Sequence, residues 1–164
     1  MKGLRLLRVF GVAVGEGELA VLGRSRRELG RDNTELHAMI ARLSRDGVPL
    51  RTHTFDGVDS ALAQTAAYDG GALYVGGTEG WLQNPSGRSL FTPGHPFLVR
   101  IEGGNVQRLH GFLPPTTGHA ELRAVGVGKG TLLLGGHENG PITHTADADR
   151  SLVRSDAWFA IRSW

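Results

Sequence analysis

The sequence predicts an all-β protein built from three copies of one antiparallel four-strand unit. Three observations support this fold class. Short apolar runs recur along the chain and are separated by turn residues, which is typical of many short strands. The chain of 164 residues contains 25 glycines, which fall between these runs without a collagen-like period. One pattern, a glycine followed by an apolar run and a second glycine, occurs three times at nearly regular spacing, as expected of a repeat architecture.

The first two strands of each unit are predicted to form a hairpin. The second strand is the glycine-bounded apolar run, at residues 17–23, 71–77 and 130–136. A shorter apolar run precedes it each time, at residues 9–14, 62–68 and 122–127. Glycine-containing turns join the runs, and glycine supplies the positive φ that tight hairpin turns need. We expect equivalent strand-end positions for Gly23, Gly77 and Gly136. A side chain at such a position would meet the neighbouring blade or need positive φ.

A third strand follows in every copy, and a fourth strand follows in the first two. The third strands are predicted at residues 38–43, 96–101 and 158–163, with the same place taken by Arg42, Arg100 and Arg162. The fourth strands are predicted at 48–55 and 106–112, whereas the third copy reaches Trp164 before any fourth run. One repeat domain over 1–164 is therefore divided into blade-like units at about 8–57, 60–114 and 120–164, the third incomplete.

Long polar segments separate the second strand of each unit from the third, at residues 24–37, 78–95 and 137–156. They differ in length, as insertions on one face of a repeat protein do. Part of the first segment has partial helical spacing, at Leu29, Leu36, Met39, Ile40 and Leu43. Pro96 and the pair Trp158-Phe159 break that pattern in the other copies, so a strand is preferred at 37–43.

The unit resembles the SBBP-type β-propeller repeats of large bacterial surface and secreted proteins. In the first copy the resemblance lies in Gly17–Ser25, an apolar run ending in Gly-x-Ser, and in Ile40–Gly47, which contains Arg-Leu-x-x-Asp-Gly. Thr78 keeps the hydroxyl residue in the second copy, whereas His137 replaces it in the third, which also lacks the Asp-Gly turn. The resemblance implies a partial β-propeller and an extracellular or cell-surface location, and it brings no catalytic residues.

Three units are too few to close a ring. Propeller blades pack face to face around an axis, and a closed propeller usually has at least four of them. Three copies leave two outer blade faces bare, and the last strand of the third copy has an unpaired edge. The chain is then part of a longer propeller, pairs with another chain, or folds as an open wedge. Of these we expect a protein partner, or self-association of the chain, to complete the ring.

The composition excludes several classes of protein. A net charge of +2 with scattered arginines does not indicate nucleic-acid binding. The absence of cysteine excludes disulfides, thiolate metal sites and a cysteine nucleophile. No apolar stretch reaches the roughly 18 residues of a membrane span, and charges interrupt the N-terminal apolar residues, so no signal peptide is visible. The compartment is left open by these observations.

Candidate metal ligands gather in the third long segment, at His137, His144, Asp147 and Asp149. Imidazole and carboxylate groups suit zinc, and two aspartates at alternate positions suit a calcium loop. However, the spacing matches no metal motif, and a third acidic ligand and a turn glycine are missing, so solvated loop residues are preferred. Because a nucleophile elbow and a phosphate loop are also missing, we predict no catalytic, cofactor-binding or metal-binding residues.

Trp81 is the one aromatic residue that suggests contact with a ligand or partner. It lies in the second long segment beside polar residues, and an exposed tryptophan can stack on a sugar or anchor a protein, although packing on its own blade is the simpler interpretation. The predicted function is a non-enzymatic structural or protein-interaction module. The alternative is a propeller lectin, hydrolase or lyase with its site on segments 24–37, 78–95 and 137–156.

Overall fold

The computed structural model of the chain describes residues 6–28, 34–54, 61–80, 94–113, 119–139 and 155–163. These residues form eleven strands and one short 3₁₀ turn, with no α-helix among them. The elements are β1 (Leu6–Val14), β2 (Glu18–Glu28), β3 (Thr34–Ser44), β4 (Pro49–Thr54), β5 (Leu62–Asp69), β6 (Ala72–Glu79), β7 (His95–Glu102), β8 (Asn105–Arg108), η1 (His110–Phe112), β9 (His119–Gly128), β10 (Thr131–Asn139) and β11 (Ser155–Ser163).

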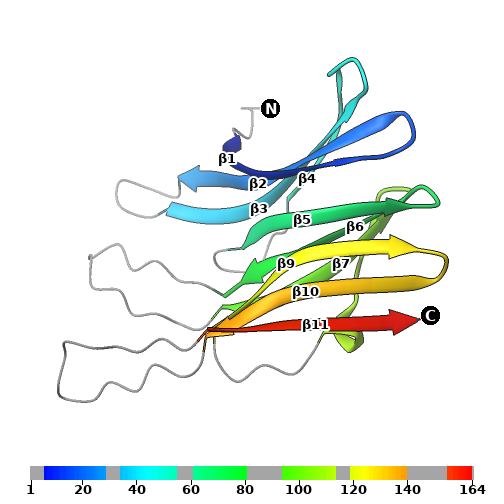
Figure 1. The fold of residues 1–164 in the computed structure, drawn as a ribbon. Coiled ribbons are helices and arrows are strands. Elements are labelled where there is room, and N and C mark those ends of the chain that lie inside the picture. The colour runs from blue at the N-terminus through cyan, green and yellow to red at the C-terminus, as the bar shows by residue number, and fades with distance from the viewer. Residues whose placement is uncertain are drawn as a thin grey trace.

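The strands form three antiparallel sheets that follow one another along the chain (Figure 1). The first sheet contains β1 to β4, the second contains β5 to β8 and the third contains β9 to β11. Within each sheet the strands lie side by side in chain order. The predicted all-β class is confirmed, and so is the strand at 37–43, which belongs to the longer strand β3. In the part of the chain that is described, no helix is long and apolar enough to cross a membrane.

Tight turns with positive φ connect the hairpin strands. Gly70 and Gly71 have φ values of 55° and 83°, and Lys129 and Gly130 have φ values of 51° and 73°. Each pair is a two-residue connection, between β5 and β6 or between β9 and β10. Two consecutive residues with positive φ are typical of a type I′ turn, whose twist matches that of the flanking strands. Lysine lacks the conformational freedom of glycine, so Lys129 holds this backbone conformation at an energetic cost.

A β-bulge occurs at a corresponding place in all three sheets. At this place the first strand of each sheet has one extra residue relative to the second strand, namely Phe10, Gln64 or Arg123, and β1 has a further one at Leu7. The residue just before each bulge pairs with a glycine of the second strand, namely Gly23, Gly77 or Gly136. The pairing therefore places these three glycines at corresponding positions, from which the other positions in each sheet can be counted.

Close packing excludes a side chain at two of these glycines. A Cβ atom on Gly77 would collide with the carbonyl oxygen of Leu62 and would lie 2.9 Å from the Phe97 ring. A Cβ atom on Gly136 would collide with the carbonyl oxygen of Glu121 and with the Trp158 ring. Neither glycine is among those with positive φ. The close approach of neighbouring strands, rather than the backbone conformation, therefore requires glycine here.

The predicted equivalence of Arg162 with Arg42 and Arg100 is wrong by one residue. Trp158 pairs with Gly136 as Phe97 pairs with Gly77 in the second sheet. Counted from these pairs, Arg42 and Arg100 correspond to Ile161, and Arg162 lies on the opposite face of its strand. The large Trp158 ring fits over the side chain-free Gly136, which sets this register.

The predicted long segments are shorter than expected, because strand pairing extends into each of them. Glu28 pairs with Thr34, Glu79 pairs with His95, and Asn139 pairs with Ser155. The fourth strand of the second sheet is also shorter than predicted, since β8 ends at Arg108 and η1 follows it. His137, predicted in a loop, therefore lies on β10.

The sheets stack face to face in chain order, and the first strand of each later sheet lies across the sheet before it (Figure 1). β5 packs against β1, β2 and β3, and β9 packs against β5, β6 and β7. In the first and second sheets, we call the face turned toward the next sheet the back face and the opposite face the front face. In the third sheet, the front face is the one turned toward the second sheet, and the back face is the opposite one. The back face of the first sheet and the front face of the second share one core, which includes Leu22, Ile40, Leu73, Val75 and Phe97. The back face of the second sheet and the front face of the third share another, which includes Tyr74, Leu98, Leu122, Leu132 and Leu134.

Candidate functional site

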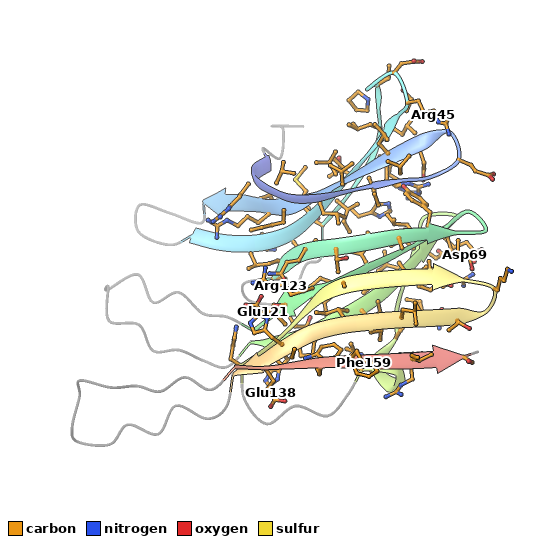
Figure 2. All side chains as sticks on the ribbon, in the orientation of Figure 1. Arg45, Asp69, Glu121, Arg123, Glu138 and Phe159 are labelled. Carbon is orange, nitrogen blue, oxygen red and sulfur yellow. The ribbon has the colours of Figure 1, made fainter. Side chains whose placement is uncertain are left out.

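A polar network joins the second and third sheets near the starts of β5 and β9. Its centre is Glu121, whose carboxylate accepts a hydrogen bond from Gln64 Nε2 (3.2 Å) and forms an ion pair with Arg123. Thr78 on β6 donates its hydroxyl hydrogen to Gln64 Oε1 at 3.3 Å. Figure 2 shows Glu121 and Arg123 together at the beginning of β9.

Two members of this network are bulge residues. Gln64 is the extra residue in β5, and Arg123 is the extra residue in β9. A bulge interrupts the strict alternation of side chains along a strand and can redirect a side chain. Gln64 therefore reaches from the second sheet to Glu121 on the third, and Arg123 reaches the same carboxylate from within β9.

His119 is held by two hydrogen bonds that define its tautomer. The backbone N–H of Gly94 donates to His119 Nδ1 at 2.9 Å, so this nitrogen carries no hydrogen. The hydrogen of the neutral ring is then on Nε2, which lies 3.0 Å from Glu121 Oε1 and donates to it. His119 therefore fixes the carboxylate of Glu121 and connects it to the backbone before β7.

The pKa of Glu121 is lowered although its side chain is mostly buried. Burial is the largest single influence and acts to raise the pKa of this carboxyl group. Hydrogen bonds from His119 and Gln64, followed by the positive charge of Arg123 and the influence of His137, outweigh burial and lower the pKa. Glu121 is therefore an ionised acceptor at neutral pH. A carboxylate stabilised in this state suits a cross-link between sheets better than general acid catalysis, which needs a raised pKa.

The predicted candidate metal ligands are only partly within the described residues. His137 pairs with Glu121 across β9 and β10, which places it beside the polar network. His144, Asp147 and Asp149 lie outside the described residues, and so does Trp81. Among the residues that the structure does describe, no group of three histidine or acidic side chains is placed to hold a metal ion.

The sequence contains one signal for this network, although it matches no catalytic or metal-binding motif. His119 and Glu121 alternate with apolar residues, a pattern that places both on one face of a strand. Their partner Gln64 is 57 residues from Glu121, and the contact depends on how two sheets stack. Alternation alone could have indicated a polar strand face, but it could not have identified Gln64.

A second polar group lies between the first and second sheets. Arg42 donates to Glu18 from Nε (3.0 Å) and from an NH2 group (2.6 Å), with both side chains largely buried. The Tyr68 ring from β5 packs on Gly15, and burial raises the pKa of the Tyr68 hydroxyl. Burial, followed by the charges of Arg51 and Arg42, lowers the pKa of His53. Of these groups, Tyr68 joins β5 to the first sheet.

Both outer faces of the stack carry exposed apolar side chains. The back face of the third sheet presents Leu133, Phe159 and Ile161, with exposed fractions of 54%, 84% and 58%. The front face of the first sheet presents Val9, Val12 and Val14 on β1, with exposed fractions of 52%, 57% and 69%, whereas Met39 on β3, which shares this face, is 5% exposed. Figure 2 shows Phe159 on β11, at the end of the stack opposite the first sheet. Contiguous exposed apolar surface usually marks a contact with another molecule.

A shallow depression of about 170 Å³ is lined by Arg100, Glu102, Asn105 and Gln107 on the second sheet. Small-molecule sites typically enclose roughly 300–1,000 Å³ with mainly apolar walls. This polar depression is smaller, so the outer apolar faces are the stronger candidate for a functional surface.

In comparisons with known proteins, the sequence matches no family model, and no curated protein matches it significantly. The resemblance to SBBP-type repeats therefore stays a prediction.

Proposed function

We propose that this chain is a non-enzymatic structural or protein-interaction module of the β-propeller type, built from repeats of the SBBP kind and active outside the cell or at a bacterial surface. The observation that carries the proposal is the exposed apolar back face of the third sheet, above all Phe159, which is 84% exposed. An aromatic side chain exposed among aliphatic ones is typical of a protein-binding surface.

The way the sheets stack supports the propeller part of the proposal. One arrangement relates the first sheet to the second and the second to the third, with the first strand of the later sheet lying across the earlier one. Blades of a propeller are small antiparallel sheets that pack on one another in a repeated arrangement. The bulges at Phe10, Gln64 and Arg123 also occur at corresponding places, as expected for repeats.

The edge of β11 supports the interaction part of the proposal. β11 pairs with β10 on one side, and no described strand lies on its other side. In the first and second sheets this side is occupied by β4 and β8. A free strand edge has unpaired backbone N–H and C=O groups that can pair with a strand of another protein.

The proposal is tested by replacing Phe159 with serine and measuring the free energy of unfolding at nanomolar chain concentration. If Phe159 is a binding residue that the chain itself leaves uncovered, Phe159→Ser should change this free energy by less than about 0.5 kcal/mol. A loss of more than about 2 kcal/mol would show that the chain covers Phe159, and the proposal would be rejected.

The competing hypothesis of a lectin or enzyme is tested separately, by titrating the chain with a panel of sugars and with divalent metal ions. Stoichiometric sugar binding that is lost in Trp81→Ala, with unfolding unchanged, would favour the lectin and overturn the interaction module. If the chain is an interaction module, no sugar should bind to it stoichiometrically. The titrations are followed by calorimetry, and the Trp81→Ala chain is titrated in the same way as the control.

A further inference from the structure

The exposed back face of the third sheet corresponds to faces that are covered elsewhere in the chain. Counted from the pairs of Gly136 with Trp158 and of Gly77 with Phe97, Phe159 corresponds to Leu98 in the second sheet. Leu98 is 2% exposed because β9 of the third sheet lies over it, whereas Phe159 is 84% exposed. Ile40 takes the same place in the first sheet and is 0% exposed beneath β5.

The exposed front face of the first sheet has covered counterparts as well. Val12 and Val14 of β1 correspond to Ala66 and Tyr68 of β5, counted from the bulge. Ala66 and Tyr68 pack into the core between the first and second sheets, whereas Val12 and Val14 are 57% and 69% exposed. In the third sheet the same places are taken by Val125 and Val127, which pack into the second core.

We infer that the back face of the third sheet of one copy binds the front face of the first sheet of a second copy. The inference rests on the proposed function and names its partner. The described sheets make this kind of contact twice, back face against front face, and the two outer faces of these sheets are the two halves of a third contact of that kind. A second copy is the occupant because every copy has both halves.

The third sheet differs from the covered sheets at one position in a way that fits this contact. Ile161 stands where the first and second sheets have Arg42 and Arg100. Arg42 forms an ion pair with Glu18, and Arg100 forms one with Glu102, each within its own sheet. Ile161 is 58% exposed and lies opposite Leu133, so the back face of the third sheet is apolar where the other two are charged. Interfaces between subunits are enriched in such apolar surface at their centre.

The contact is head-to-tail, because two different faces meet. Head-to-tail contacts form closed rings when the rotation between copies closes, and open filaments when it does not. Propellers typically have about four to eight blades. Two copies, each with the three sheets that the structure describes, would supply six, whereas a third copy would exceed this range. A closed dimer with two identical contacts is the expected assembly.

Sedimentation equilibrium of the purified chain at micromolar concentration tests the inference. The wild-type chain should have the mass of two copies. Phe159→Arg and Val12→Arg should each raise the dissociation constant by at least about 30-fold, because a charge enters the centre of the contact from one side or the other. Val106→Arg is the matched control, because Val106 is a 46% exposed apolar residue on β8 of the middle sheet. This variant should dimerise as the wild type does.

Mixing the two variants distinguishes a head-to-tail contact from a symmetric one. The Phe159→Arg chain keeps an intact front face and the Val12→Arg chain keeps an intact back face. An equimolar mixture should therefore form a two-chain complex through one contact, although neither variant does so alone. If Val12→Arg dimerises normally, the contact is not made by the front face of the first sheet, and the inference is wrong.

The failure of this inference differs from the failure of the proposed function. A wild-type chain that stays monomeric at micromolar concentration, with Phe159→Arg unfolding at the same denaturant concentration, refutes the second copy and leaves the face free for another protein. A Phe159→Arg monomer that is strongly destabilised shows that the chain covers this face itself, which refutes both.

Discussion

Replacement of Gly77 by alanine should be among the most damaging single-methyl changes in this chain. A Cβ atom at this position would collide with the carbonyl oxygen of Leu62 on β5 and would also lie 2.9 Å from the ring of Phe97 on β7. The obstacle on one side is backbone in a paired strand, which cannot rotate away as a side chain can. Overpacking of a tight interior typically costs about 1–3 kcal/mol. We expect Gly77→Ala to cost about 2–3 kcal/mol in free energy of unfolding.

Gly128→Ala is the matched control, because a Cβ atom there would have no neighbour within 4 Å and the residue does not have positive φ. It should be neutral or stabilising by up to about 1 kcal/mol, since alanine restricts the unfolded chain more than glycine does. Both variants are compared with the wild type by urea unfolding, monitored by tryptophan fluorescence. If Gly77→Ala unfolds within about 0.5 kcal/mol of the wild type, the bulge does not bring β5 as close to Gly77 as described, and the register argument is wrong.

Three further variants test separate parts of the structure. Glu121→Gln should lose about 1–3 kcal/mol at neutral pH. The pKa of Glu121 lies below its usual 4.5 in the folded chain, so the carboxylate contributes its full stability above pH 4.5 and loses it as the pH falls through the folded pKa. The free energy of unfolding of the variant should therefore depend less steeply on pH below 4.5 than that of the wild type. Leu98→Ala should cost about 3 kcal/mol in free energy of unfolding, because Leu98 is 2% exposed. The same change at Leu133, which is 54% exposed, should cost less than about 1 kcal/mol in the monomer, and equal costs would contradict the assignment of faces. Lys129→Gly should raise the melting temperature, with a gain of up to about 1 kcal/mol from relief of the positive φ of 51°, and a lower melting temperature would show that the lysine side chain itself contributes stability.

The hairpins could be predicted from sequence because their determinants are local. The glycines at 70, 71 and 130 occur in short turns between apolar runs, and positive φ at these positions is a property of two or three neighbouring residues. The strand at 37–43 was ambiguous locally, and comparison with Pro96 in the second copy decided it correctly.

The register of β11 could not be predicted in the same way. The sequence pattern aligned Trp158 with Ala38 and Pro96, but Trp158 pairs with Gly136, so Ile161 rather than Arg162 corresponds to Arg42. A shift by one residue exchanges the two faces of a strand, and only the contact of the Trp158 ring with Gly136 sets it.

Of the candidate sites, the outer faces could be predicted from the sequence and the polar network around Glu121 could not. Glu121, Gln64 and His119 come together through the stacking of two sheets, which no spacing in the sequence encodes. The bare outer faces, by contrast, follow from counting three units, although the residues that form them, such as Phe159, depend on register. The prediction for Trp81 falls on residues outside the described ranges and stays a prediction.

The central claim, that the back face of the third sheet is a free binding face, is tested most directly by thiol labelling of Leu133→Cys. The chain contains no cysteine, so the single introduced thiol reports on one position. Leu98→Cys, on the covered back face of the second sheet, is the control and should react slowly at every chain concentration. We predict that Leu133→Cys reacts nearly as fast as an unfolded thiol at nanomolar concentration and becomes protected at micromolar concentration, as a second copy covers the face. Slow labelling of Leu133→Cys at every concentration would show that the chain covers its own third sheet and would contradict the account.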